Sequence, residues 1–377
     1  MPGKRRPPHP WAGLPCPPDD LFDVLGGLLR GEDAAVARLI SMRPGAIEAI
    51  QVLLARHRVG PFLQHRLRDS PVTQALPAEV REQIRARHRR QVEIAQGCLG
   101  LLEMFDRECH AAAIPFLLLK GPAMAQRLYG DVAGRGFWDL DILVAEHDRA
   151  RMFHLLDRCG CFRLSTVFVS DRLSAAFTHA FDYEKDGVRL DLHWSLSRLP
   201  GLRCEVAGVM ARRQQFEVGG VSAPVLCMED ELAFLLVSVF ADIQRGSVRL
   251  QSFVDVWQLL RRTPVTDWSR FIANRVSEGS DRICADTLRV TLGALDLGGE
   301  FPELVDRLGG CPPTGEARSL LLSSSGGIRR KAWAAQRLPV SLPRYAAWWL
   351  LSLPFRVAAS HPAWRRPLPP SGSPTQR

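Results

Sequence analysis

The chain has 377 residues, which exceeds the usual size of one domain and predicts a central unit with additions. Hydrophobic residues make up 46% and charged residues 24% of the composition, which excludes a wholly disordered or fibrous protein. The net charge of +9 comes from the C-terminal end, because residues 317–377 contain ten basic residues and no acidic ones. Residues 1–316 therefore carry a net charge of −1 and form a nearly neutral body.

The cysteines and the chain ends indicate a reduced, cytoplasmic protein. Nine cysteines are scattered without a Cys-x-x-Cys pair or the paired histidines that would complete a zinc site. Residues 1–18 are rich in proline and lack the apolar region of a secretory signal, so we expect a disordered leader. The longest apolar run, Tyr345 to Phe355, is shorter than the roughly 20 residues that span a bilayer, which predicts no transmembrane segment.

The first part of the chain changes from helical spacing to a strand pattern. Between residues 19 and 112 the apolar residues recur at helical spacing, which predicts an N-terminal helical lobe. The continuous apolar run IPFLLL then predicts a buried strand over residues 114–119. Lys120, Gly121 and Pro122 end this strand, and proline near the first position favours a helix that reaches about Tyr129.

The central region continues with strands and helices, after which helical spacing returns. Residues 137–144 alternate as a strand, 147–159 have helical spacing, and 176–184 with 188–194 form a hairpin around Lys185, Asp186 and Gly187. Helical segments dominate from Glu229 onward. We therefore expect a core at 113–200, a C-terminal helical lobe at 201–327 and a basic, partly disordered tail at 328–377.

Three aspartates on the predicted strands are the candidate catalytic residues. Asp139 and Asp141 lie two residues apart in a strand, so their carboxylates share one face. Like charges at this spacing repel each other unless a cation lies between them, and carboxylate oxygens are ligands that Mg²⁺ prefers. On the later strand, Asp191 shares a face with Arg189 and His193 and is placed to complete a cluster of three carboxylates.

Such a cluster is typical of a two-metal displacement at the α-phosphate of a nucleoside triphosphate. Lys120 and Gly121 lie where a strand ends and a helix begins, a position that favours phosphate binding. Two interpretations of Arg135 stay open, because it is placed either to pair with Asp139 or to contact the triphosphate. His193 is expected to be a packed, hydrogen-bonded side chain.

Three segments occur in order along the chain: LLLKGPAMAQRLYGD, R-x-x-x-DLDILV and VRLDLHWSL. With them the chain resembles, over about residues 20–265, the bacterial nucleotidyltransferase family of the polymerase β-like superfamily. The resemblance implies an α+β fold, in which a small mixed sheet with helices forms a polymerase β-like core between N- and C-terminal helical lobes. The segments HRVGPFL, at 57–63, and FVDVWQLL, at 253–260, are similar to the family's flanking segments.

The resemblance also implies the ligands of the site. Asp139, Asp141 and Asp191 fall on the family's metal-binding positions, and Mg²⁺ or Mn²⁺ is the implied cofactor. Lys120, Gly121, Tyr129 and Arg135 fall on its other motif positions. Wider members of the superfamily place serine after the glycine, whereas Pro122 follows Gly121 here, so phosphate binding is expected to rely on Lys120.

The leading hypothesis is an enzyme that transfers a nucleoside monophosphate from a triphosphate such as ATP to an unknown acceptor hydroxyl or phosphate, releasing pyrophosphate. One alternative is an antitoxin-like enzyme that adds AMP to a protein. Another is a non-catalytic nucleotide-binding protein that keeps the fold. The basic tail is suited to weak contact with an anionic membrane surface or nucleic acid, or it is a solvated terminus.

Overall fold

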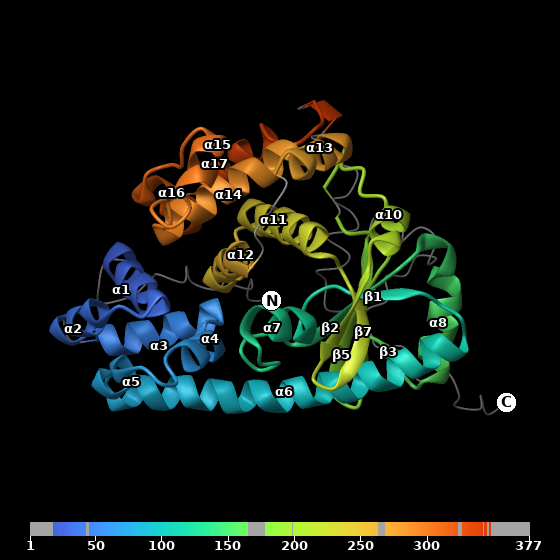
Figure 1. Ribbon diagram of the computed structural model, residues 1–377, viewed down its shortest axis with the longest axis horizontal. Helices are drawn as coiled ribbons and strands as arrows, with labels where there is room; N and C mark the ends of the chain where they lie inside the picture. The colour runs from blue at the N-terminus through green and yellow to red at the C-terminus, as the bar shows by residue number, and fades with distance from the viewer. Residues whose placement is uncertain are drawn as a thin grey trace, which may run out of the picture. The chain divides into compact units, whose positions relative to one another are not determined.

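The computed structural model describes residues 18–42, 45–164, 178–197, 199–262, 268–322, 326–341, 343–344 and 347 (Figure 1). The predicted leader up to residue 17, and the run Tyr345 to Phe355 apart from residue 347, lie outside the described residues. The chain forms two compact units. The helical unit takes residues from 1–90, 239–258 and 285–334, and the sheet unit takes residues from 91–238, 259–284 and 335–377. Both units are therefore discontinuous, whereas the sequence analysis divided the chain into contiguous lobes.

Helices make up the described part of the helical unit, and several of them continue into the sheet unit. The helices within it are α1 (Pro18–Arg30), α2 (Asp33–Ser41), α3 (Ala46–His57), α4 (Gly60–Arg66), α5 (Pro71–Ala75), α15 (Pro302–Leu308), α16 (Thr314–Leu322) and, except for its last residue, α17 (Gly326–Ala335). Those shared with the sheet unit are α6 (Ala78–Ala111), α11 (Met228–Arg245), α12 (Leu250–Arg262) and α14 (Asp281–Leu295).

The two segments that are similar to the family's flanking segments pack together within the helical unit. The ring centroids of Phe62 and Trp257 lie 6.5 Å apart in an edge-to-face contact. His57 Nδ1 accepts a hydrogen bond of 3.1 Å from the backbone N–H of Leu250, the first residue of α12. Burial lowers the pKa of His57 to about 3, so the imidazole is neutral and keeps the lone pair that this bond needs.

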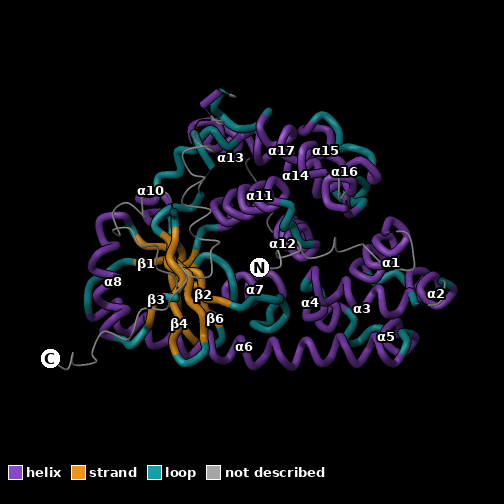
Figure 2. Tube along the Cα trace, turned by 180° about the vertical axis from the view of Figure 1, so that it is seen from behind, coloured by secondary structure: helices purple, strands orange, loops and turns teal. Residues whose placement is uncertain are grey.

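A mixed seven-stranded sheet forms the centre of the sheet unit (Figure 2). Its order is β3-β4-β5-β2-β1-β7-β6, in which β1 pairs parallel with β7 and β2 pairs parallel with β5, while the other neighbours are antiparallel. The strands are β1 (Phe116–Leu118), β2 (Asp139–Val144), β3 (Phe162–Arg163), β4 (Ala180–Lys185), β5 (Val188–His193), β6 (Gln214–Val218) and β7 (Val221–Val225). The remaining elements of this unit are α7 (Pro122–Tyr129), η1 (Glu146–Asp148), α8 (Arg149–Arg158), α10 (Val206–Ala211) and α13 (Trp268–Glu278).

Alternate residues of the strands bury their side chains in two separate cores. Phe116, Leu118, Leu140 and Ile142 pack with the C-terminal half of α6 and with α8. Leu117, Leu119 and Leu143 pack instead with α10 and the start of α11. Because side chains alternate between the faces of a strand, the odd-numbered residues of β2 share the face that carries the α10 core. The aspartates of β2 are odd-numbered and therefore lie on this face.

The predicted α+β class is confirmed, and most elements of the predicted core are present. The strand, helix, strand and helix expected between residues 114 and 159 correspond to β1, α7, β2 and α8. Proline is at the first position of α7, as its place after Gly121 predicted. The predicted hairpin corresponds to β4 and β5, although its expected start at 176–177 lies outside the described residues.

The sheet extends beyond the expected core limit at residue 200. Residues 201–327 were expected to form a helical lobe, but β6 and β7 lie in this range and join the edge of the sheet beside β1. β6 has the sequence QQFEV, whose polar content fits an edge strand and gives little apolar signal. Gly219 and Gly220 connect the two strands with φ angles of 59° and 91°, which are the angles that a tight hairpin turn requires.

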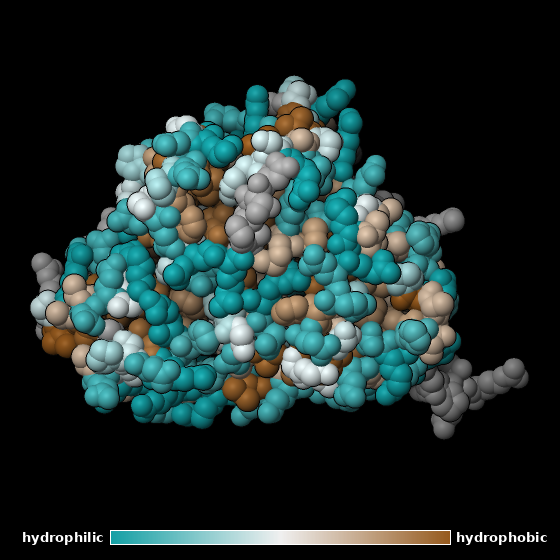
Figure 3. All heavy atoms as spheres, in the orientation of Figure 1, coloured by the Kyte–Doolittle hydropathy of each residue, from teal (hydrophilic) through white to brown (hydrophobic). Residues whose placement is uncertain are grey.

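The start of the expected basic tail belongs to the helical unit. α17 begins at Gly326, the Trp333 ring lies 5.2 Å from that of Phe240, and Ala334 is fully buried. No helix in the described ranges is long and apolar enough to cross a bilayer. The face shown in Figure 3 is mainly hydrophilic, with apolar side chains in small scattered groups.

Replacing Arg127 by alanine is expected to destabilise the sheet unit by roughly 3–5 kcal/mol, because the buried Glu231 carboxylate would lose its cation. The Arg127 side chain is 9% exposed and also donates to the Leu226 carbonyl at 2.9 Å. Thermal unfolding measures the effect. The control is Arg89→Ala, whose guanidinium is 62% exposed and should leave the unfolding temperature unchanged. Equal shifts for the two variants would contradict the assignment.

Candidate active site

Parallel pairing of β2 with β5 brings two of the predicted aspartates side by side. In this register Asp141 lies directly opposite Asp191, and Asp139 lies opposite Arg189. Asp141 is fully buried, while Asp139 and Asp191 are half-buried. Residues opposite each other on neighbouring strands point to the same side of the sheet, so these carboxylates share the face that carries the α10 core. The sheet thus holds acidic groups next to one another.

The close group of candidate ligand atoms comes from Asp141, Asp191 and His193, all within 4.8 Å of one another. The strand pattern predicted Asp139 in this group and His193 as a packed, hydrogen-bonded side chain. Asp139 lies two residues before Asp141 on the same face, and its charge raises the pKa values of Asp191 and Lys120, so it contributes to the same electrostatic environment. Its role as a ligand stays a prediction.

Lys120 lies two residues after the end of β1, and its ammonium contacts the carboxylate of Asp141. The Lys120 Nζ lies 3.1 Å from Asp141 Oδ1. The same oxygen lies 3.1 Å from His193 Nε2, and because an ionised carboxylate is only an acceptor, Nε2 carries the proton and donates. Asp141 Oδ2 is buried and has no hydrogen-bond partner among the residues that the structure describes. Within this part of the chain, one oxygen of Asp141 therefore has two partners and the other has none.

The two facing carboxyl groups differ strongly in acidity. Burial alone would raise the pKa of Asp141, but the Lys120 charge and the His193 hydrogen bond outweigh it and lower the pKa to about 2. Burial and the charges of Asp141, Asp139 and Asp182 raise the pKa of Asp191 to about 8. In the protein alone, Asp141 is thus the ionised partner and Asp191 holds a proton at neutral pH.

These residues fit a hard divalent cation. Asp141 offers a buried, unpartnered oxygen, and the proton on Asp191 marks a position where positive charge is favoured. Carboxylate oxygens suit Mg²⁺ and Mn²⁺. His193 lies within reach of both carboxylates. The sequence signals for it were its place on the Asp191 face and its place in the segment VRLDLHWSL, which predict direction but not distance.

Other predicted site residues lie next to this group. Burial would lower the pKa of Lys120, but the charges of Asp141 and Asp139 raise it, while the Arg135 guanidinium acts in the opposite direction. Arg135 is buried and close enough to Lys120 to affect it, and both of its predicted roles stay open. Tyr129 is buried at the end of α7.

Two backbone contacts position the start of β2. Gly121 has φ 69° and ψ −126°, and a Cβ atom there would lie 3.1 Å from the Asp139 carbonyl oxygen. The buried Gln91 side chain of α6 forms two hydrogen bonds of 3.3 Å with the backbone N–H and carbonyl of Phe137. The sequence analysis did not find this role for Gln91, because a single glutamine in a long helix carries no distinguishing pattern.

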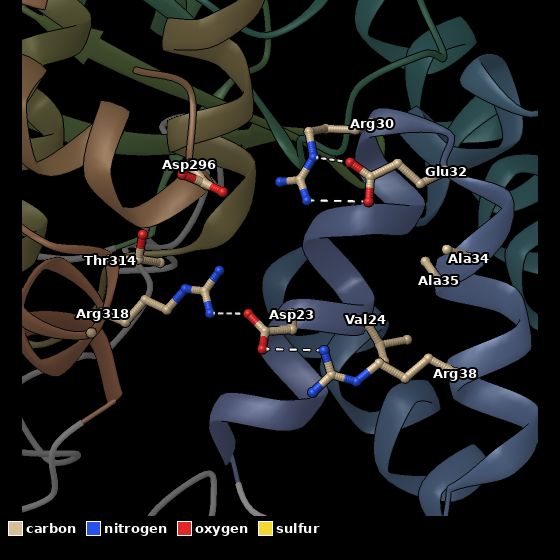
Figure 4. Close-up of a pocket in the computed structure, with 11 residues that line it drawn as sticks. Asp23, Val24, Arg30, Glu32, Ala34, Ala35, Arg38, Asp296, Thr314 and Arg318 are labelled. Atoms are coloured by element: carbon tan, nitrogen blue, oxygen red, sulfur yellow. Dashed lines mark hydrogen bonds and ion pairs between the residues drawn. The ribbon is translucent and has the colours of Figure 1, made fainter. Parts of the chain in front are cut away.

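A cavity of about 640 Å³ lies in the helical unit, apart from the acidic group (Figure 4). Its arginines are paired with neighbouring acids or carbonyls. Arg30 binds Glu32 at 2.5 Å, Arg38 binds Asp23 at 3.4 Å, and Arg318 also binds Asp23. Charges neutralised in this way do not indicate an anion site. We therefore place the candidate active site at the acidic group of the sheet unit.

Changing Gly121 to alanine is expected to separate the Lys120 and Asp139 backbones and to weaken Mn²⁺ binding several-fold. These backbone angles are strongly unfavourable for alanine, and its Cβ would lie too close to the Asp139 carbonyl oxygen. Gly130→Ala is the matched control, because Gly130 also has a positive φ of 68° but has no atom within 4 Å of its Cβ position. That change should cost roughly 1–2 kcal/mol of stability without affecting the cation. Equal Mn²⁺ affinities, measured by electron paramagnetic resonance, would refute the positioning role of Gly121.

The stability of the protein in EDTA is expected to fall as the pH rises from about 5 to 8.5. The pKa of Asp191 rises from 3.8 to about 8 on folding, so its contribution is complete below about pH 4 and is lost through pH 8. Asp191→Asn, which mimics the protonated form, should flatten the decline of the unfolding temperature. Asp186→Asn, on the exposed hairpin turn, should not. Parallel curves for wild type and Asp191→Asn would show that Asp191 titrates normally.

Among known proteins, one family matches more than half of the sequence. No curated protein matches the sequence. Among solved structures, the antibiotic-resistance factor ANT(2'')-Ia is 12% identical, with a TM-score of 0.35, covering 47% of this chain and 90% of that one. An antigenic nucleotidyltransferase-like protein from Paracoccidioides brasiliensis is 14% identical, with a TM-score of 0.32, covering 60% of this chain and 95% of that one. Residues 44–291 match the family described as uncharacterised nucleotidyltransferase. Because this match spans more than half of the sequence, the chain belongs to that nucleotidyltransferase family.

Proposed function

We propose that the protein transfers a nucleoside monophosphate from a nucleoside triphosphate to an acceptor hydroxyl or phosphate, with a divalent cation as cofactor. The observation that carries the proposal is the pairing of Asp141 with Asp191 on adjacent strands, beside the ammonium of Lys120. Family membership supports nucleotidyl transfer in general. The acidic face adds the chemistry that such a transfer needs.

Asp141 and Asp191 would hold Mg²⁺ or Mn²⁺, with Asp139 as the proposed third carboxylate. When bound, the cation would neutralise charge on the triphosphate and make the acceptor oxygen a better nucleophile. Asp141 is suited to bind first because it is ionised at neutral pH, whereas Asp191 must release its proton. His193 would orient Asp141 through its hydrogen bond of 3.1 Å.

The remaining residues would position the triphosphate. In the reaction, the acceptor oxygen forms a bond to the α-phosphorus, the bond to the bridging oxygen breaks, and pyrophosphate leaves with the electron pair. Lys120 would provide a positive charge for the phosphates, and Gly121 would let the backbone approach them because it has no side chain. Arg135 is the second proposed phosphate contact. Its charge acts to lower the pKa of Lys120, so the two cations act in the same electrostatic environment.

The ionised state of Asp141 favours an active enzyme over a non-catalytic nucleotide-binding protein. Its carboxylate is kept charged while one of its oxygens has no partner among the described residues, at the burial cost that such an atom carries. A protein that bound the triphosphate without its cation would not need this arrangement. Transfer of AMP to a protein remains the second candidate within the same chemistry, because a protein hydroxyl is one class of acceptor.

Pyrophosphate release from each of the four triphosphates tests the proposal, with Mg²⁺ and cell extract as the source of acceptors. Asp141→Asn is expected to lower the rate by about 100-fold or more, because it removes the negative charge of a proposed ligand of the cation while keeping the side-chain shape. Circular dichroism checks folding. Asp186→Asn serves as the control and should retain the wild-type rate. A wild-type rate in Asp141→Asn would refute the metal assignment, and labelled AMP on a protein band would identify the second candidate.

A further inference from the structure

The Lys120 ammonium lies beside the Asp141 carboxylate, where the proposed divalent cation would also bind. Its Nζ is 3.1 Å from Asp141 Oδ1, although the proposed function requires a divalent cation at the same carboxylate. Two cations that share one carboxylate repel each other, and the repulsion is strong at a buried site. Asp141 is 1% exposed, so little water is present to screen it. Binding of the divalent cation at Asp141 therefore opposes this position of Lys120.

Lys120 has the freedom to leave this position. Its side chain is 35% exposed and is carried on a flexible stem of four carbons. Asp141 would keep its hydrogen bond to His193 after the ammonium departs. Gly121 follows directly and begins the turn into α7, so the residue that carries the ammonium adjoins the backbone at which phosphates are proposed to bind.

The choice of residue fits a cation that exchanges between two partners. The sequence contains only four lysines among its 49 basic residues, and Lys120 is one of them. Arginine would hold Asp141 with a rigid fork of two hydrogen bonds, whereas lysine is a single point charge that rotates and moves easily. A lysine is therefore suited to an ion pair that must break during binding.

We propose that Lys120 occupies the cation position at Asp141 until a nucleoside triphosphate binds. The ammonium then leaves Asp141 and pairs with the phosphates. The inference rests on the proposed function and adds an order to it. A bound nucleotide attracts the Lys120 ammonium to its phosphates and leaves Asp141 accessible to the metal. A bound metal repels the ammonium from Asp141 toward the phosphates. Because coupling between two ligands is reciprocal, each raises the affinity of the site for the other.

Mn²⁺ binding without nucleotide tests the inference, measured by electron paramagnetic resonance at pH 7.5. Lys120→Met should bind Mn²⁺ about tenfold more tightly than wild type, equivalent to about 1.4 kcal/mol. Lys120→Arg keeps the cation and should remain weak. Lys185→Met removes a charge at the hairpin end and should also resemble wild type. A non-hydrolysable nucleoside triphosphate analogue should then raise the affinity of the protein for Mn²⁺ more in wild type than in Lys120→Met.

The outcomes separate the inference from the proposed function. Loss of Mn²⁺ binding in Asp141→Asn, together with equal Mn²⁺ affinities for wild type and Lys120→Met, would overturn the role of Lys120 and leave the metal site intact. Mn²⁺ binding that is unaffected by Asp141→Asn would instead contradict the metal site itself. Tighter binding in Lys120→Met and not in Lys120→Arg would support exchange of one cation for another.

A second measurement needs no variant at Lys120. An amine-acylating reagent followed by proteolysis and mass spectrometry reports the reactivity of each lysine, with Lys185 as the internal reference. Lys120 should react slowly in the protein alone, faster with Mn²⁺, and slowly again when Mn²⁺ and the triphosphate analogue are both present. Reactivity that Mn²⁺ leaves unchanged would show that the ammonium is not displaced and would overturn the inference.

Discussion

The site depends on the parallel pairing of β2 with β5, which forces the Asp141 and Asp191 carboxyl groups together on one face. This arrangement is unfavourable for the protein alone, because both groups cannot ionise side by side in a partly buried place. Only one of the two groups is ionised: Lys120 and His193 stabilise the charge of Asp141, while Asp191 keeps a proton. The fold therefore holds the two groups in a state that a divalent cation would relieve. The chain belongs to a nucleotidyltransferase family, and in the proposed function a bound cation would relieve this repulsion.

Elements far apart in sequence keep this pairing in place. Gln91 of α6 holds the backbone of Phe137 just before β2, and Gly121 lets the turn after β1 approach Asp139 closely. The core between the sheet, α6 and α8 supports the opposite face. Small displacements of a catalytic group cost large factors in rate, so these contacts matter more for chemistry than their individual energies indicate.

Much of this arrangement was predictable because the alternation of residues along a strand indicates which face of the sheet each side chain is on. The alternation in residues 137–144 placed Asp139 and Asp141 on one face, and a second alternating run did the same for Asp191. The pattern does not state which strand lies beside which, so the distance from His193 to Asp141 could not be predicted. The attachment of Lys120 to Asp141 depends on the same pairing. β6 was missed because this edge strand is mostly polar and leaves a weak apolar signal. β7 was missed because it is short and its sequence VSAPV contains a proline, which argues against a strand inside a sheet, although the Gly-Gly turn between the two was visible.

The distribution of charge explains why one lysine has such weight. Residues 1–316 carry a net charge of −1, so the body has no general positive field that would attract a triphosphate. Arginines that line the cavity of the helical unit are bound to neighbouring acids, which removes them as anion contacts. The negative charge of the nucleotide must then be met by cations inside the site. Positive charge also stabilises the Asp141 and Asp191 carboxylates. Lys120 can therefore pair either with these carboxylates or with the phosphates of the proposed nucleotide. In the proposed function, a divalent cation that arrives with the nucleotide would satisfy both, because it would supply positive charge to the carboxylates and release the ammonium for the phosphates.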